Sequence, residues 1–189
     1  MIPDNLQESS LYMKQVYLLT GVPGTGKTSL IKQAVAEMAG KAGGFYTEEI
    51  RSRGIRKGFR LVTLDGQSAI LAHVKSQSRY RVGKYGVDID SLDQVGVPAL
   101  LKAAEQCDVI VIDEIGKMEL FSDRFKKAVL EIIEGDKRVL GTIMFNPNQW
   151  ADAIKRRPQV DIVPVTGSNY QQVLAGVKRW LETIDEDKT

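Results

Sequence analysis

Short apolar runs alternate with amphipathic segments along most of the chain. Residues 15–20 (Gln-Val-Tyr-Leu-Leu-Thr) form an apolar run that predicts a buried strand. Residues 29–39 carry apolar side chains at helical spacing and glycines follow, so we expect a helix that ends there. Residues 109–112 are a continuous aliphatic run, which is typical of a strand buried on both faces. Similar patterns predict further strands over 138–144 and 160–165, and further helices over 98–106, 122–134, 150–157 and 170–184.

The stretch from residue 44 to residue 74 interrupts this alternation. It holds the pair Asp65-Gly66 and three short β-like runs, which cover 44–50, 58–64 and 69–74. An Asp-Gly pair between alternating runs is a strong hairpin signal. We therefore predict an α/β fold of three layers, with a mainly parallel sheet between helices and an antiparallel β insertion near residues 44–74. The polar, glycine-bearing segment 76–93 is expected to be an ordered loop or lid.

Length and composition restrict the class of protein. The 189 residues suit one domain, which we place at 14–184 between a flexible N-terminal extension (1–13) and an acidic tail (185–189). With 43% hydrophobic and 26% charged residues, the chain has the composition of a globular protein. No apolar run approaches the ~20 residues that cross a bilayer, and the polar N-terminus lacks a signal-peptide pattern. We therefore expect a cytoplasmic monomer that makes no membrane contact.

Charge, cysteine and histidine content narrow the chemistry further. A formal net charge of +2 neither demands nor excludes a nucleic-acid partner. The single Cys107 cannot form an internal disulfide, and together with the single His73 it leaves no Cys/His cluster for zinc. We interpret Cys107 as a core residue and His73 as a strand residue rather than as reactive groups.

A glycine-rich loop between the first strand and the first helix carries the clearest chemical signal. It consists of Gly21, Val22, Pro23, Gly24, Thr25, Gly26, Lys27 and Thr28. Its glycines let the backbone turn tightly and bring amide N–H groups against phosphate oxygens, and the helix adds its partly positive N-terminus. Lys27 suits the β- and γ-phosphates, and the Thr28 hydroxyl suits Mg²⁺. The loop predicts that the protein binds a nucleoside triphosphate together with Mg²⁺.

A second candidate segment is a strand that ends in two acidic residues. It consists of Val109, Ile110, Val111, Ile112, Asp113 and Glu114. Because the carboxyl ends of parallel strands meet at one edge of a sheet, we expect Asp113 on a strand neighbouring that of the glycine loop, aimed at the magnesium shell. Glu114 suits a general base that polarises the attacking water, a role that adds about 10²- to 10⁴-fold in rate. The alternative for Glu114 is a surface or ion-paired residue.

Thr142 and several cations are further candidates around the same crevice. The Thr142 hydroxyl suits sensing of the γ-phosphate or holding of the water, and a β-branched strand residue equally suits a structural role. Phosphoryl transfer benefits from a cation over the developing charge. The candidates are Lys117, Arg156, Arg157 and the basic run 51–60. That run fits a solvated face better than a site, and positive charge at 156–157 is favourable at a helix C-terminus in any case.

Several longer strings are distinctive, namely Gly43-Gly44-Phe45-Tyr46-Thr47-Glu48-Glu49-Ile50-Arg51, Arg81-Val82-Gly83-Lys84-Tyr85-Gly86-Val87-Asp88, Ile112-Asp113-Glu114-Ile115-Gly116-Lys117-Met118-Glu119-Leu120 and Leu140-Gly141-Thr142-Ile143. With their order intact, they resemble the cancer-related (THEP-type) nucleoside-triphosphatases over about residues 14–182. The resemblance implies a RecA-like P-loop NTPase of the additional-strand, catalytic-glutamate class. It implies slow hydrolysis of ATP, GTP and other triphosphates to diphosphate and phosphate, with weak base preference.

The resemblance also assigns residues. It places the phosphate loop on residues 21–28 and a second nucleotide-binding segment on 109–116, which adds Ile115 and Gly116 to the candidates. Two features depart from the family pattern: the extension 1–13, and Met144-Phe145 where we expect a proline. Neither touches the phosphate chemistry.

Two other functions fit parts of the sequence. A nucleotide or small-molecule kinase also uses a phosphate loop, and the segment 76–93 could be the lid that excludes water. Glu114 argues against a kinase, because a water-activating carboxylate would waste the nucleotide. A nucleotide-gated module that binds RNA or a partner protein would use the basic hairpin 51–60. No other feature of the sequence supports a nucleic-acid partner.

Overall fold

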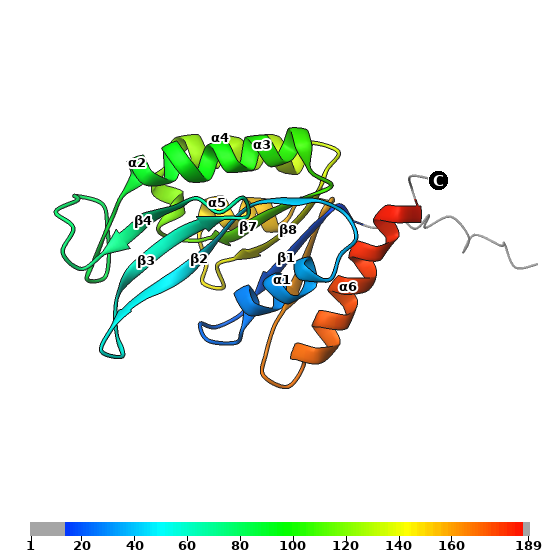
Figure 1. The fold of residues 1–189 in the computed structure, drawn as a ribbon, viewed down its shortest axis with the longest axis horizontal. Coiled ribbons are helices and arrows are strands. Elements are labelled where there is room, and N and C mark those ends of the chain that lie inside the picture. Colours follow the sequence, from blue (N-terminus) through cyan, green and yellow to red (C-terminus); the bar gives the residue numbers. More distant parts are fainter. Residues whose placement is uncertain (1–13, 187–189) are drawn as a thin grey trace, which may run out of the picture.

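The nine strands found within residues 14–186, the part that the computed structural model describes, form one sheet (Figure 1). Its order is β5-β6-β4-β3-β2-β7-β8-β1-β9. The strands are β1 (Val16–Thr20), β2 (Ala42–Ser52), β3 (Ile55–Thr63), β4 (Ser68–His73), β5 (Arg81–Val82), β6 (Tyr85–Val87), β7 (Val109–Ile115), β8 (Arg138–Ile143) and β9 (Val160–Pro164).

Helices cover both faces of this sheet. They are α1 (Lys27–Ala36), α2 (Ile89–Ser91), α3 (Val97–Gln106), α4 (Asp123–Glu134), α5 (Gln149–Lys155) and α6 (Tyr170–Glu186), with a π turn η1 (Leu92–Gly96) and a 3₁₀ turn η2 (Glu119–Phe121). The core under α3, α4 and α5 is centred on Phe45 and Phe125, and the core under α1 and α6 includes Leu30 and Trp180. The predicted three-layer α/β fold is confirmed. No helix in the described part of the chain is long and apolar enough to span a membrane.

The parallel part of the sheet differs from the sequence-based expectation in strand order. Strands β2, β7, β8, β1 and β9 run parallel, but β8 lies between the phosphate-loop strand β1 and the acidic strand β7. The expectation that β1 and β7 are neighbours was therefore wrong. In β8, Thr142 pairs with Leu19 of β1 and Gly141 pairs with Ile112 of β7, so the three strands end level with one another.

The antiparallel insertion is confirmed, and it continues the same sheet. Strand β2 pairs in parallel with β7 on one side and antiparallel with β3 on the other. The pair Asp65-Gly66 lies in the connection from β3 to β4, as predicted. Gly44 fits where β2 meets β7, because its φ is +107° and a Cβ there would lie 2.1 Å from the Val111 carbonyl oxygen. The insertion therefore begins at a position that only glycine fills without strain.

The segment 76–93 is more regular than the predicted loop or lid. It contains the β5–β6 hairpin, which pairs with β4 through Ala72 and His73, and it continues into α2 and η1. Tyr85 and Val87 are buried against Ala72, and this small apolar cluster explains why the segment folds onto the sheet. The apolar positions in the segment are too few to reveal a strand by periodicity alone.

The two ends of the predicted domain fall close to the limits of the described residues. The extension 1–13 and residues 187–189 of the predicted acidic tail lie outside them. Helix α6 continues to Glu186 rather than stopping at 184, and α1 begins at Lys27 rather than 29.

Candidate active site

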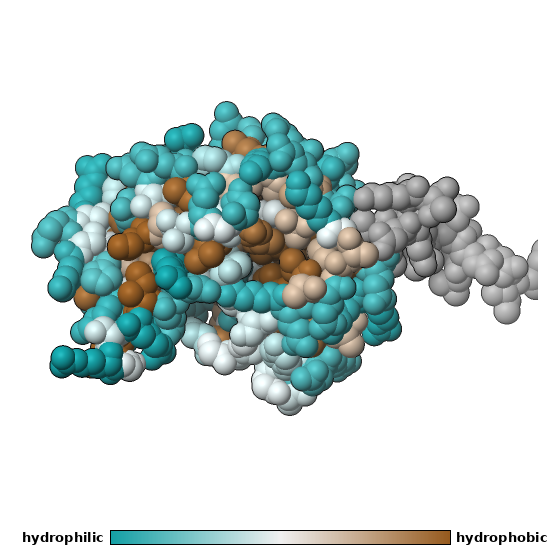
Figure 2. Space-filling model, in the orientation of Figure 1, coloured by the Kyte–Doolittle hydropathy of each residue, from teal (hydrophilic) through white to brown (hydrophobic). Residues whose placement is uncertain are grey.

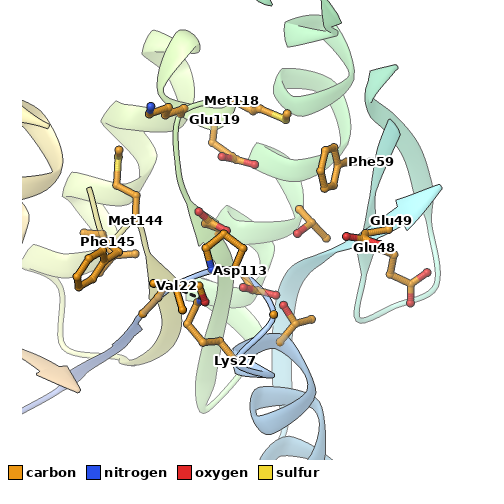
Figure 3. A pocket seen from close by; sticks show the side chains of 18 of the residues that line it. Val22, Lys27, Glu48, Glu49, Phe59, Asp113, Met118, Glu119, Met144 and Phe145 are labelled. Atoms are coloured by element: carbon orange, nitrogen blue, oxygen red, sulfur yellow. Dashed lines mark hydrogen bonds between the residues drawn. The ribbon is translucent and has the colours of Figure 1, made fainter. Parts of the chain in front are cut away.

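A cavity of about 720 Å³ opens where β1, β7 and β8 end. Its walls come from the glycine loop, from the segments after β7 and β8, and from β2 and β3 of the insertion (Figure 3). The predicted site residues that line it are Gly21, Val22, Pro23, Gly24, Gly26, Lys27, Thr28, Asp113 and Glu114. The other predicted residues lie outside the described lining: Thr25, Thr142, Gly116, and the buried β7 residues Val109, Ile110, Val111, Ile112 and Ile115.

Glycines determine the shape of the phosphate loop. Gly21 has φ +147°, and a Cβ at this position would lie 2.5 Å from the Val165 carbonyl oxygen. Gly26 has φ +85° and is the N-cap of α1, where a Cβ would lie 3.0 Å from the Tyr170 ring. These turns place the start of α1 at the cavity. The free N–H groups and the partly positive end of this helix therefore provide an anion site.

Lys27 is held by the loop that precedes it. Its Nζ donates to the carbonyl oxygens of Gly21 at 2.9 Å and of Val22 at 3.1 Å, and the Thr25 hydroxyl donates to the same Val22 oxygen. Within the described residues, Lys27 forms no ion pair with a carboxylate. Its positive charge is therefore oriented into the loop and remains available for an anionic ligand.

Asp113 is a buried carboxylate with only one of its oxygens paired. Its exposed fraction is 1%, and Oδ1 accepts a 2.5 Å hydrogen bond from the Thr142 hydroxyl, while Oδ2 has no hydrogen-bonding partner in the described structure. Burial raises the pKa of Asp113, and the nearby Thr142 and Thr28 hydroxyls and the Lys27 charge act in the opposite direction. An unpaired buried carboxylate oxygen is costly unless a cation or donor reaches it. Asp113 and Thr28 therefore fit a Mg²⁺ ion.

The protein side chains at this position do not form a complete metal site by themselves. The described residues contain no group of three or more His, Cys, Asp or Glu side chains placed to hold a metal ion. Mg²⁺ at nucleotide sites is bound by one or two protein ligands together with waters and phosphate oxygens, so Thr28 and Asp113 match this pattern.

Glu114 and Thr142 occupy different environments. Glu114 is half-buried in the cavity wall, and its pKa is raised by burial and by the charge of Asp113, against an opposing effect of Lys27. Thr142 is fully buried, and its hydroxyl is used by Asp113. Glu114 can thus contact a ligand in the cavity, whereas Thr142 acts on the cavity through Asp113.

Glu119 is a cavity residue that the motif analysis did not single out. Only 4% of it is exposed, and burial together with the charge of Glu114 raises its pKa to about 8. Figure 3 shows its side chain pointing from the segment after β7 into the cavity. The sequence offered one hint of burial, because this glutamate stands between the apolar residues Met118 and Leu120. Nothing in the local pattern shows that the rest of the protein packs over this segment.

Cations of the basic hairpin are mostly paired with acidic residues of β2. Arg51 and Arg56 contact Glu49 at 2.5 and 2.7 Å, and Arg60 contacts Glu48 at 2.8 Å. These ion pairs are partly exposed and each contributes little to stability. Of the cations proposed for phosphoryl transfer, Lys117 and Arg56 line the cavity, whereas Arg156 and Arg157 follow α5 outside its described lining.

Comparisons with known proteins identify the family of this chain. A family model described as NTPase matches residues 16–177. The nucleoside-triphosphatase THEP1 of Thermotoga sp. (strain RQ2) is 45% identical over 157 residues, covering 83% of this chain and 90% of the relative. The cancer-related nucleoside-triphosphatase homolog of Mus musculus is 39% identical over 182 residues, covering 87% of this chain and 95% of the relative.

Two solved structures share the fold. The crystal structure of THEP1 from the hyperthermophile Aquifex aeolicus has a TM-score of 0.82 at 34% identity, covering 88% of this chain and 99% of the other. The solution structure of a human cancer-related nucleoside triphosphatase has a TM-score of 0.74 at 36% identity, covering 90% of this chain and 98% of the other. Because the family model and these relatives match most of its length, the chain belongs to the NTPase family.

Proposed function

We propose that the protein hydrolyses nucleoside triphosphates to the diphosphate and phosphate with Mg²⁺, and with little preference for the base. The observation that carries the proposal is the convergence of Lys27, Asp113 and Glu114 in one cavity. Each of these groups acts on the phosphate chain or on water rather than on the base. Because all nucleoside triphosphates share that phosphate chain, the site supports low base specificity.

Binding would rest on the glycine loop, with Thr28 and Asp113 holding Mg²⁺. The bound ion supplies positive charge to the triphosphate oxygens. Lys27 and the N–H groups at the start of α1 neutralise the same oxygens. Thr142 keeps the Asp113 carboxylate oriented through the 2.5 Å hydrogen bond to Oδ1, which leaves Oδ2 free.

Hydrolysis would use Glu114 as the general base. Its carboxylate accepts a proton from a water molecule while the water oxygen bonds to the γ-phosphorus and the bond from that phosphorus to the β–γ bridging oxygen breaks. The diphosphate leaves with the electron pair of that bond, and Glu114 returns its proton to solvent. The raised pKa of Glu114 makes this carboxylate a stronger base than an exposed glutamate.

The decisive experiment measures phosphate release from a panel of nucleoside triphosphates and diphosphates with and without Mg²⁺. We expect similar turnover for all triphosphates, and only with Mg²⁺. Glu114→Gln should keep nucleotide binding and lose about 10²- to 10⁴-fold in turnover, because the amide cannot accept the proton. Glu105→Gln on the exposed face of α3 is the matched control. Wild-type turnover in Glu114→Gln would remove Glu114 from the mechanism.

A small-molecule or nucleotide kinase is a second candidate, because the cavity extends past the phosphate loop to apolar residues of the insertion, of β5 and of the segment after β7. Phe59, Val82 and Met118 line that part and offer room for a second substrate. Phosphate release without any added acceptor separates the two functions: release no greater than background would favour the kinase.

The remaining expectations concern partners and location. We propose a cytoplasmic monomer, in line with the globular composition of 43% hydrophobic and 26% charged residues. Light scattering of the purified protein tests the monomer. A role in RNA binding has less support, because Arg51, Arg56 and Arg60 are engaged in ion pairs with Glu48 and Glu49.

A further inference from the structure

Glu119 is an acidic side chain that the proposed reaction does not use, although it lies in the cavity wall. Its exposed fraction is 4%, and it starts the 3₁₀ turn η2 a few residues after the acidic pair at the end of β7. Acidic side chains are almost never fully buried unless they are paired. The described hydrogen bonds and ion pairs give Glu119 no cationic side-chain partner. Its position therefore requires another explanation.

Gly116 shows where the Glu119 carboxyl is directed. A Cβ on Gly116 would lie 2.6 Å from Glu114 Oε1 and 3.0 Å from Glu119 Oε2. Both carboxyl groups thus occupy the space above the Gly116 backbone in which another residue would place its side chain. They converge on one point from opposite ends of the segment that joins β7 to η2, so they lie next to each other.

Two ionised carboxylates in such a place would repel each other strongly, since little water screens them. Burial and the charges of Glu114 and Asp113 raise the pKa of Glu119 to about 8, and the backbone N–H groups of Glu119 and Gly116 act in the opposite direction. Lys27, on the α1 side, acts on Glu114. A neutral Glu119 carboxyl can donate a hydrogen bond, which an ionised one cannot.

We propose that Glu119 is a positioning residue, which donates a hydrogen bond to the Glu114 carboxylate and holds it towards the phosphate loop. The inference rests on the proposed function, because it assigns Glu119 to the carboxylate that orients water. Its chemical consequence is that one oxygen of Glu114 is fixed by Glu119 while the other faces the ligand. Displacement of a reacting group by about 1 Å can cost 10²-fold in rate, so loss of this hydrogen bond should lower turnover.

The test compares Glu119→Ala, Glu119→Gln and the surface control Glu105→Gln in steady-state phosphate release between pH 6 and 9.5. In Glu119→Ala, kcat should fall about 10- to 100-fold while KM for the nucleotide stays within about twofold, because Glu119 does not touch the phosphates. Glu119→Gln should recover most of that loss, because its amide is a neutral donor of the same length. Glu105→Gln should match the wild type throughout.

The pH profile separates positioning from a purely structural role. Wild-type kcat should decline on the alkaline side as Glu119 loses its proton, and Glu119→Gln should lack that decline. The inference is overturned if Glu119→Ala keeps wild-type kcat, or if Glu119→Gln shows the same alkaline decline as the wild type. Thermal unfolding of each variant identifies loss of fold, and the wild-type and Glu119→Gln profiles still decide the question if Glu119→Ala does not fold.

Parallel measurements on Glu114→Gln distinguish this inference from the function on which it rests. If Glu114→Gln loses turnover while Glu119→Ala keeps it, hydrolysis through Glu114 stands and only the role of Glu119 is refuted. If Glu114→Gln keeps wild-type turnover, both assignments are refuted.

Discussion

Removal of the Thr142 hydroxyl tests how Asp113 is held. Thr142 is fully buried, Asp113 is 1% exposed, and the hydroxyl donates to Oδ1 at 2.5 Å while Oδ2 is unpaired. Thr142→Val keeps the shape of the side chain but removes the hydrogen bond to Oδ1 of Asp113. Loss of a hydrogen bond to a charged group costs about 1.5–3 kcal/mol of folding free energy. For a chain of this length, that loss corresponds to a Tm about 4–10 °C lower.

The assay is thermal and urea unfolding of the metal-free protein at pH 7, with Thr142→Ser as the matched control. The serine variant keeps the hydroxyl and loses only one buried methyl group, so it should cost about 1 kcal/mol. Burial raises the pKa of Asp113, so this group favours the folded state at acid pH and loses that contribution as pH rises. The deficit of Thr142→Val should therefore shrink as the pH is lowered and the carboxyl takes up a proton. A deficit below about 0.5 kcal/mol at pH 7 would refute the reasoning.

Three further predictions follow from other positions. Gly44→Ala should lower the free energy of unfolding in urea by about 3 kcal/mol or more, because a Cβ there meets the Val111 carbonyl oxygen at 2.1 Å. The control Gly66→Ala, where a Cβ meets open space, should lower it by about 1–2 kcal/mol. Equal losses of stability in the two variants would contradict this. Lys27→Ala should weaken nucleotide binding about 10- to 100-fold by calorimetry, as expected for a lost charged hydrogen bond, and unchanged affinity would exclude the lysine from the site. Wild-type stability should fall by up to about 1.4 kcal/mol per pH unit between about pH 4.5 and 8, because folded Glu119 keeps a proton that the unfolded chain has lost. Glu119→Gln should show a shallower slope, because the raised pKa values of Asp113 and Glu114 still contribute to it; the same slope in both proteins would refute the raised pKa of Glu119.

The geometry of the proposed phosphate site was largely predictable from local sequence. The glycines at 21, 24 and 26 are required wherever the loop turns, and their positive φ angles agree with that expectation. The position of Asp113 was predictable because a continuous apolar strand leads to the edge of the sheet, although β7 continues two residues beyond Asp113 to Ile115. The hairpin after β3 was predictable from Asp65-Gly66, since that pair suits positive φ and Gly66 has φ +94°.

The identity of neighbours in the sheet was not predictable in this way. Strand β8 lies between β1 and β7, although the local periodicity of all three strands is similar. Pairing across the sheet depends on how each helix packs back onto it, and this is a property of the whole chain. The consequence for the site is that Thr142 comes to lie against Asp113 and not at the surface of the cavity.

The sequence by itself determined the glycine loop and the adjacent acidic pair Asp113 and Glu114, on which the proposed phosphate and Mg²⁺ site rests, because spacing along one strand–loop–helix unit or one strand encodes each of these features. The tertiary structure alone decided which other groups act on them. Arg51, Arg56 and Arg60 became partners of Glu48 and Glu49 through the register of β2 and β3. Glu119 came to lie beside Glu114 because the chain turns over Gly116 and is then buried. The ionisation of an acidic side chain such as Glu119 depends on its burial and on the charges of nearby segments, and the local pattern of residues predicts neither.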